Sequence, residues 1–163
     1  MRLFVAIQLS DDMKKSIVTL MHDLKAKGIK GNYTPLQNLH LTMCFIGETK
    51  EREVVEQALS AVRYKPFKLA TSDLGNFGDL LWLGTRSGQA INTLAADIRK
   101  ALKEVGISFD DQKFTPHITL VRRMTGGSYK MTVPKKEMMV KKISLMKSEQ
   151  VKGKMVYTEI YSF

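Results

Sequence analysis

Two short motifs of the same form are the residues of this chain best suited to chemistry. One reads His-Leu-Thr-Met and begins at His40, and the other reads His-Ile-Thr-Leu and begins at His117. Apolar and polar residues alternate in both, a pattern typical of a half-buried β-strand, on which residues two apart share a face. Each strand is therefore predicted to direct an imidazole and the hydroxyl of Thr42 or Thr119 to one side of a sheet.

Two imidazoles that face one cleft can give and take a proton in the same reaction. The ordinary pKa of histidine, about 6.5, lets one ring be neutral and the other protonated near neutral pH. The chemistry that needs this pair is displacement at phosphorus without a metal. The threonine hydroxyls, on the same face, can hydrogen-bond the non-bridging phosphate oxygens.

Other kinds of site lack their motifs in this sequence. The histidines have no second histidine or carboxylate at the spacings of a zinc site. No GxSxG elbow indicates a serine hydrolase, and no P-loop or GxGxxG indicates a nucleotide cofactor. We therefore expect no metal and no cofactor.

Composition sets the broad class. The 163 residues are 44% hydrophobic and 26% charged, which predicts a globular fold with a sizeable core and one domain over 1–163. No apolar run reaches the ~20 residues of a membrane span. The opening MRLFVAIQLSDD turns acidic too soon for a signal peptide, and a single Cys44 allows no internal disulfide. These features favour the cytoplasm.

The net charge of +10 and the pI near 9.7 favour a polyanionic partner. No feature indicates a protein partner.

The apolar pattern predicts strands and helices in alternation. Ser10 and Thr49 are predicted N-caps, and Gly28 and Gly106 are predicted helix stops. We expect strands over 2–9, 39–46, 66–74, 79–85, 138–149 and 153–162 and through the second motif, helices from Ser10 to Gly28 and over 50–63 and 88–105, a loop over 29–38, and a hairpin turn at 152–154. This order predicts an α+β fold with antiparallel or mixed sheets and an internal pseudo-two-fold symmetry.

Residues 40–47, HLTMCFIG, and residues 115–122, TPHITLVR, resemble the paired HxTx motifs of the 2H phosphoesterase superfamily. Within it, the chain is most similar to the RNA 2′,3′-cyclic phosphodiesterases, the LigT-like family once described as 2′-5′ RNA ligases. The resemblance covers the whole chain. It implies a bilobed fold in which two sheets flank a central cleft and the helices lie outside.

The resemblance also implies a role for each site residue. His40 would donate a proton to the departing 3′ oxygen, and His117 would accept one from water. Thr42 and Thr119 would hold the phosphate, and Arg122 would neutralise the charge that develops on it. The product would be a 2′-phosphomonoester at an RNA end.

Aromatic and basic residues near the motifs are candidates for contacts with RNA. Phe45 can stack on a base or pack in the core, and Tyr33 is a second candidate for stacking. A loop after the second motif carries basic side chains that can guide an RNA end or simply be solvated: Arg122, Arg123, Lys130, Lys135 and Lys136.

Three alternatives stay open on the sequence alone. The substrate can be a small cyclic nucleotide such as ADP-ribose 1″,2″-cyclic phosphate. The same histidines can run the reverse reaction and ligate RNA through a 2′-5′ linkage. The chain can also be an RNA-binding module without turnover, although both motifs are intact.

Overall fold

The computed structural model describes all residues from Met1 to Phe163. It contains three α-helices, one short 3-10 helix and nine strands. In chain order these are β1 (Arg2–Gln8), α1 (Asp11–Ala26), β2 (Lys30–Tyr33), η1 (Leu36–Asn38), β3 (His40–Glu48), α2 (Arg52–Ser60), β4 (Phe67–Phe77), β5 (Leu80–Arg86), α3 (Ala90–Glu104), β6 (His117–Thr125), β7 (Glu137–Val140), β8 (Ser144–Val151) and β9 (Lys154–Ser162).

The strands form two halves that meet at one point. One half has the order β7-β4-β5-β6, with β2 also paired to β6, and the other has the order β3-β1-β8-β9. Every pairing is antiparallel, and the halves are joined by a single registered pair, Leu41 with Ile118. The predicted α+β class with antiparallel strands is confirmed, and the two expected sheets are continuous through this pair.

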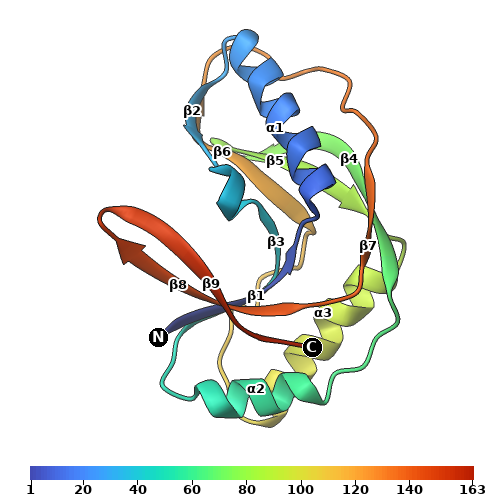
Figure 1. The fold of residues 1–163 in the computed structure, drawn as a ribbon, viewed down its shortest axis with the longest axis vertical. Coiled ribbons are helices and arrows are strands. Elements are labelled where there is room, and N and C mark those ends of the chain that lie inside the picture. Colours follow the sequence, from blue (N-terminus) through green and yellow to red (C-terminus); the bar gives the residue numbers. More distant parts are fainter.

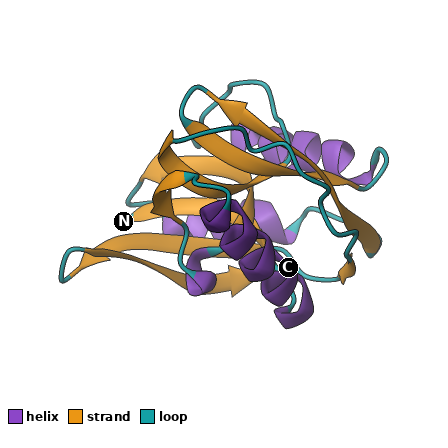
Figure 2. Ribbon diagram, turned by 90° about the horizontal axis from the view of Figure 1, so that it is seen from above, coloured by secondary structure: helices purple, strands orange, loops and turns teal.

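The helices lie outside the strands, at opposite ends of the molecule. Figure 1 shows α1 at the end formed by β2, β4, β5 and β6, and α2 and α3 at the other end, below β1. In the view turned by 90°, the strands lie between these helices (Figure 2). None of the helices combines the length and apolar composition needed to cross a membrane.

Helix α1 forms where the sequence predicts it. Ser10 is the N-cap, and its hydroxyl accepts a hydrogen bond of 3.2 Å from the backbone N–H of Met13. The helix buries one apolar stripe at helical spacing: Met13, Ile17, Leu20, Met21 and Leu24. Gly28, with φ +93°, follows its end, as expected for a left-handed helix stop.

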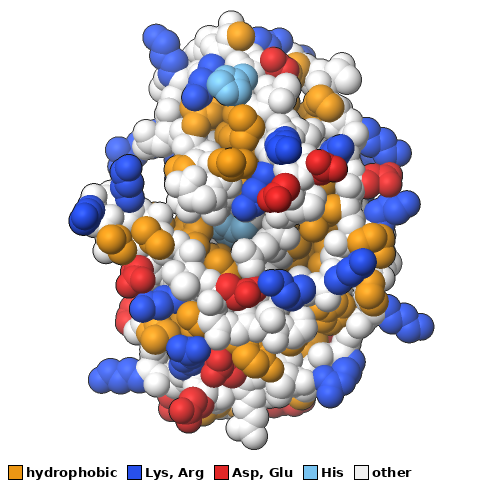
Figure 3. Space-filling model, viewed as in Figure 1, with side chains coloured by type: hydrophobic (Ala, Val, Ile, Leu, Met, Phe, Trp, Pro, Cys, Tyr) orange, Lys and Arg blue, Asp and Glu red, His pale blue; other side chains and the backbone are white.

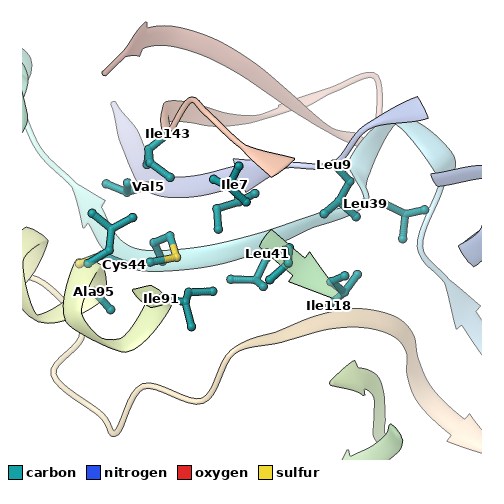
Figure 4. Close-up of a cluster of buried hydrophobic side chains, with 14 of the residues drawn as sticks. Val5, Ile7, Leu9, Leu39, Leu41, Cys44, Ile91, Ala95, Ile118 and Ile143 are labelled. Atoms are coloured by element: carbon teal, nitrogen blue, oxygen red, sulfur yellow. The ribbon is translucent and has the colours of Figure 1, made fainter. Parts of the chain in front are cut away.

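The main core is a cluster of 35 buried residues, and a second, smaller cluster holds Phe4, Ala6 and Met146. In Figure 4, Ile91 and Ala95 of α3 face Leu41 and Cys44 of β3, and Val5 of β1 lies on the far side of β3. This packing fixes β3, the strand that begins with the first motif, on both of its flanks.

The hairpin of β8 and β9 turns at Lys152 and Gly153, both with positive φ, 50° and 78°. Two consecutive left-handed residues form the turn type that matches the twist of paired strands. The predicted hairpin is confirmed, and it projects from the body beside the N-terminus (Figures 1 and 2).

Residues 29–38 were expected to be a loop, but they contain β2 and η1. Strand β2 exists because it pairs with the edge of β6, where Asn32 lies opposite Arg122. Gly31 has φ +147°, and a Cβ there would come within 2.7 Å of the Arg122 carbonyl oxygen. Glycine is typical of turns, so the local sequence does not predict this strand, which forms because β2 pairs with β6 in the folded protein.

The predicted strand over 138–149 is in fact two strands with different partners. Strand β7 pairs with β4 in one half, and β8 pairs with β1 in the other. The predicted N-cap of the second helix is also wrong. Helix α2 begins at Arg52 with Glu51 as N-cap, and Thr49 instead accepts from the Glu51 N–H at 3.0 Å.

Candidate functional site

Both motif histidines are the first residue of a strand, and the two strands begin side by side. His40 opens β3 and His117 opens β6, and the single pair between these strands is Leu41 with Ile118. The side chains of Leu41 and Ile118 are fully buried. Extending the antiparallel register by one residue each way places His40 opposite Thr119, and Thr42 opposite His117. All four polar side chains are half-buried and share the other face of the two strands.

Each imidazole is oriented by the same local contact. Nδ1 of His40 donates to the carbonyl of Asn38 at 2.7 Å, and Nδ1 of His117 donates to the carbonyl of Thr115 at 2.6 Å. In both motifs the acceptor lies two residues before the histidine, just outside the strand. A carbonyl bonded to Nδ1 fixes the proton on that nitrogen, so Nε2 is the working atom of each neutral ring.

Thr42 completes the surroundings of His40 within its own motif. The Thr42 Oγ1 lies 2.9 Å from His40 Nε2, and with the proton on Nδ1 the hydroxyl donates to Nε2. A phosphate oxygen that reaches this position can take over the hydroxyl proton. The arrangement thus holds Nε2 and a hydroxyl ready for the same ligand.

Aromatic rings enclose His40 on two sides. The ring centroid of Phe4 lies 5.0 Å from that of His40, and Tyr157 lies edge-on at 5.2 Å. The rings exclude water from the imidazole, which disfavours its charged form.

Burial lowers the pKa of His40 below its usual value. The positive charges of Arg122, His117 and Lys14 lower this pKa further, whereas the hydrogen bond to Asn38 opposes the shift. Arg122 and His117 are therefore near enough for their charges to act on His40. Burial therefore favours the neutral form of His40 in the free protein.

We expect an NMR titration of the free protein to give His40 a midpoint below about 6.5. Because the folded pKa lies below the unfolded one, the unfolded chain takes up this proton first as the pH falls. The stability that His40 contributes is present above about pH 6.5 and is lost as the pH falls through the folded pKa. Urea unfolding at pH 7.5 and 5.5 should show a smaller pH effect for His40→Gln than for the wild type. A His40 midpoint at or above the ordinary value would contradict this prediction.

A cavity of about 490 Å³ adjoins the motifs. Thr42 and His117 line it, as do three phenylalanines, Phe45, Phe77 and Phe114. Its volume lies in the range of about 300–1,000 Å³ that is typical of small-molecule sites. In the space-filling view, histidine atoms lie at the floor of a hollow near the centre of the face, and both basic and acidic side chains surround it (Figure 3).

Cys44 also borders this cavity, but its chemistry is suppressed. The side chain is 2% exposed, and burial raises the pKa of the thiol to about 12. A thiol with this pKa is not ionised near neutral pH, so Cys44 is no nucleophile there. The His, Cys, Asp and Glu side chains form no group of three that could hold a metal ion.

The structure brings the sequence-predicted site residues together to different degrees. His40, Thr42, His117 and Thr119 share one surface at the junction of β3 and β6. Arg122 is exposed on β6 and acts on His40 through its charge.

Phe45 is half-buried on β3 and borders the cavity. On its other side the Arg2 guanidinium lies 5.1 Å from the ring centroid. Tyr33 does not line the cavity. Its hydroxyl donates to the Ile29 carbonyl at 2.7 Å, and the Lys25 ammonium lies over its ring at 4.6 Å.

Arg122 and Arg123 were predicted to lie in a basic loop but belong to strand β6, and the rest of that loop is partly attached to the body. The backbone N–H of Lys136 donates to the Thr71 hydroxyl at 2.9 Å, and the Lys130 carbonyl accepts from Lys27 Nζ at 2.7 Å. The side chain of Lys135 lies 3.8 Å from Glu137. These contacts fix the course of the loop along β4 and near α1.

Sequence reasoning missed the aromatic residues around the two imidazoles. Phe4 and Tyr157 flank His40, and Phe77 and Trp82 flank His117. Their strands lie far apart in the chain, so no local pattern links them to the motifs. Phe77 alone carried a signal, because it is an aromatic residue in the segment between the strands predicted over 66–74 and 79–85.

Comparison with known proteins places this geometry in a family. The family model of the 2′-5′ RNA ligase superfamily matches residues 13–152. An RNA 2′,3′-cyclic phosphodiesterase of Thermotoga maritima is 31% identical over 131 residues, which are 75% of this chain and 70% of that protein. One of Geobacillus stearothermophilus is 30% identical over 132 residues, or 76% of this chain, but the match spans only 42% of its length.

Solved structures agree with the sequence comparison. A crystal structure of Escherichia coli LigT complexed with 3′-AMP superposes with a TM-score of 0.84 at 26% identity, covering 99% of this chain and 95% of LigT. An α+β fold with two histidine–threonine strands at one cleft defines the 2H phosphoesterase class of hydrolases. The chain belongs to the 2′-5′ RNA ligase superfamily, as the motifs predicted.

Proposed function

We propose that this protein hydrolyses 2′,3′-cyclic phosphates at RNA ends to 2′-phosphomonoesters, with two histidines and no metal. The observation that carries the proposal is the junction of β3 and β6. Its single pair, Leu41 with Ile118, brings the two histidine–threonine units side by side. Each imidazole has its Nδ1 bonded to a carbonyl, which leaves Nε2 for substrate.

The proposed reaction is an in-line displacement at phosphorus. Nε2 of His117 accepts a proton from water as the water oxygen bonds to phosphorus. The bond from phosphorus to the ribose O3′ breaks, and Nε2 of His40 donates its proton to O3′. The product keeps its phosphate on O2′ and gains a free 3′ hydroxyl. The two rings end with their protonation states exchanged.

The lowered pKa of His40 in the free protein is compatible with a role as proton donor, because we expect the bound substrate to raise this pKa and so protonate the ring. The cyclic phosphate is an anion, and its binding offsets the positive charges of Arg122 and Lys14 that lower this pKa. Thr42 and Thr119 bind the non-bridging oxygens, and Arg122 stabilises the charge of the pentacovalent transition state.

An RNA substrate is supported by charge and by the relatives. The net charge of +10 attracts a polyanion. Several relatives are named for RNA 2′,3′-cyclic phosphates, and the LigT crystal structure holds a nucleotide. Phe45 is proposed to contact the terminal base from the cavity wall. We further propose that residues 1–163 act as one bilobed domain in the cytoplasm, since the core cluster spans both halves.

The decisive experiment is to incubate the protein with an RNA oligomer ending in a 2′,3′-cyclic phosphate and to analyse the product ends. We expect a 2′-phosphate, formed at the same rate with and without EDTA. A 3′-phosphate product, or activity lost in EDTA and restored by zinc, would contradict the mechanism. Turnover of ADP-ribose 1″,2″-cyclic phosphate alone would instead indicate a small-molecule enzyme. Joining to a 5′-hydroxyl RNA would indicate a ligase, and binding without turnover an RNA-binding module.

A further inference from the structure

Phe77 is a large apolar side chain that the fold leaves in solvent. It is the last residue of β4, beside the turn at Gly78, and 47% of it is exposed. Its ring meets that of His117 edge-on, with 5.3 Å between centroids and 85° between planes. It also lines the cavity that His117 and Thr42 border. Among the large apolar side chains that are exposed, Phe77 is the only aromatic one, and it lies beside a candidate catalytic group.

The surroundings of Phe77 hold it in place without covering it. The Asn76 amide donates to the Gly78 carbonyl at 2.9 Å, and the Tyr129 hydroxyl donates to Asn76 Oδ1 at 2.7 Å. These bonds fix the turn. Trp82 supports the ring, with centroids 5.3 Å apart.

The support by Trp82 depends on a glycine. The indole lies against Gly75, where an added Cβ would come within 2.3 Å of the indole ring. Absence of a side chain at Gly75 therefore lets the indole lie flat on β4 beside Phe77. A side chain that is already fixed loses little conformational entropy when a ligand stacks on it.

We infer that Phe77 is the stacking surface for the base of the terminal nucleotide, whose cyclic phosphate lies between His40 and His117. This inference rests on the proposed function and deepens it. Phe77 comes from the half of the molecule that contains β4 and β5. Phe45, in the wall of the same cavity, comes from the other half. The terminal base thus bridges the two halves, with one aromatic side chain from each.

Stacking on Phe77 does not depend on which base is present, because every base has a π-face that can lie on an aromatic ring. Phe77 therefore accounts for affinity toward a nucleotide of any sequence. Removing the Phe77 ring should lower kcat/KM for a substrate with a terminal base by about 5- to 150-fold, the range for loss of one base–aromatic stack.

The test compares two RNA trinucleotides that end in a 2′,3′-cyclic phosphate, one with a terminal adenosine and one with an abasic terminal ribose. We expect Phe77→Ala to lower kcat/KM on the adenosine substrate within that range and to change it less than about twofold on the abasic one. Phe77→Trp should keep the adenosine activity. Met139→Ala is the matched control, since Met139 is also 47% exposed but lies on β7 and does not line the cavity.

Equal losses on both substrates would overturn the inference, because Phe77 would then act only through His117. An unchanged rate on the adenosine substrate would overturn it as well. A wild-type protein inactive on both would instead refute the proposed function. The stacking role is then tested by measuring binding. Phe77→Ala should weaken the binding of adenosine 2′-monophosphate and leave the binding of inorganic phosphate unchanged. Equal affinity of wild type and variant for the nucleotide would refute it.

Discussion

Replacing either motif histidine should lower kcat for hydrolysis of a cyclic RNA end by at least ~10²-fold, the lower bound for a general acid or base. His40→Gln and His117→Gln remove the ring and keep a polar side chain of similar size. The loss should fall on kcat more than on KM, since proton transfer assists the transition state and not substrate binding. Single-turnover rates on an RNA oligomer with a 2′,3′-cyclic phosphate end measure it.

His22→Gln is the control for this pair, since His22 is the third histidine and is exposed on α1. It should leave the rate unchanged. The double variant of His40 and His117 should be little slower than the slower single variant, because the two rings act in one proton-transfer step. Near-normal turnover by either single variant would rule out the two-histidine mechanism.

The placement of the two candidate histidines on strands was predictable, because the alternating pattern lies in the same short segments as the histidines. Alternation in residues 40–43 and 117–120 gives both the strand and the face on which His and Thr lie. Pro116 directly precedes the strand that begins at His117, whereas the first motif strand was predicted from residue 39 and begins one residue later, at His40, after η1. Local pattern and site therefore coincide.

The meeting of the two motifs was not predictable in the same way. It depends on one antiparallel pair, Leu41 with Ile118, between residues far apart in the chain. A shift of this register by one residue would turn one histidine to the opposite face. Nothing in either segment specifies the pairing, which follows from how both strands pack on the common core.

The same limit explains what the sequence concealed elsewhere. The apolar pattern over 138–149 is strand-like throughout, yet the chain leaves β4 after Val140 and joins β1 at Ser144. Periodicity reports that a segment is extended and says nothing of its partners. Tyr157 reaches His40 only because β8 and β9 lie beyond β1, so its contact with the imidazole is a result of topology.

Because one registered pair joins the two halves, we expect substitutions at that pair to lower the free energy of unfolding strongly. Leu41 is fully buried between the motif residues of β3. Leu41→Ala should lower the free energy of unfolding by about 2–5 kcal/mol, the cost of a cavity in a close-packed core. Urea unfolding monitored by circular dichroism measures the loss. Leu36→Ala, at a leucine that is 49% exposed in η1, is the matched control and should change stability by less than about 0.5 kcal/mol.

A variant of Ile118, the partner of Leu41, tests whether the loss of stability arises at the pair that joins β3 and β6. Ile118 is also fully buried, and Ile118→Val removes a single methylene at an expected cost of about 0.5–1.5 kcal/mol. If the two side chains support each other across the junction, the double variant should lose less than the sum of the single losses, since one cavity serves both. Strict additivity would show that the halves are held together elsewhere. A loss below about 1 kcal/mol for Leu41→Ala would contradict close packing at this position.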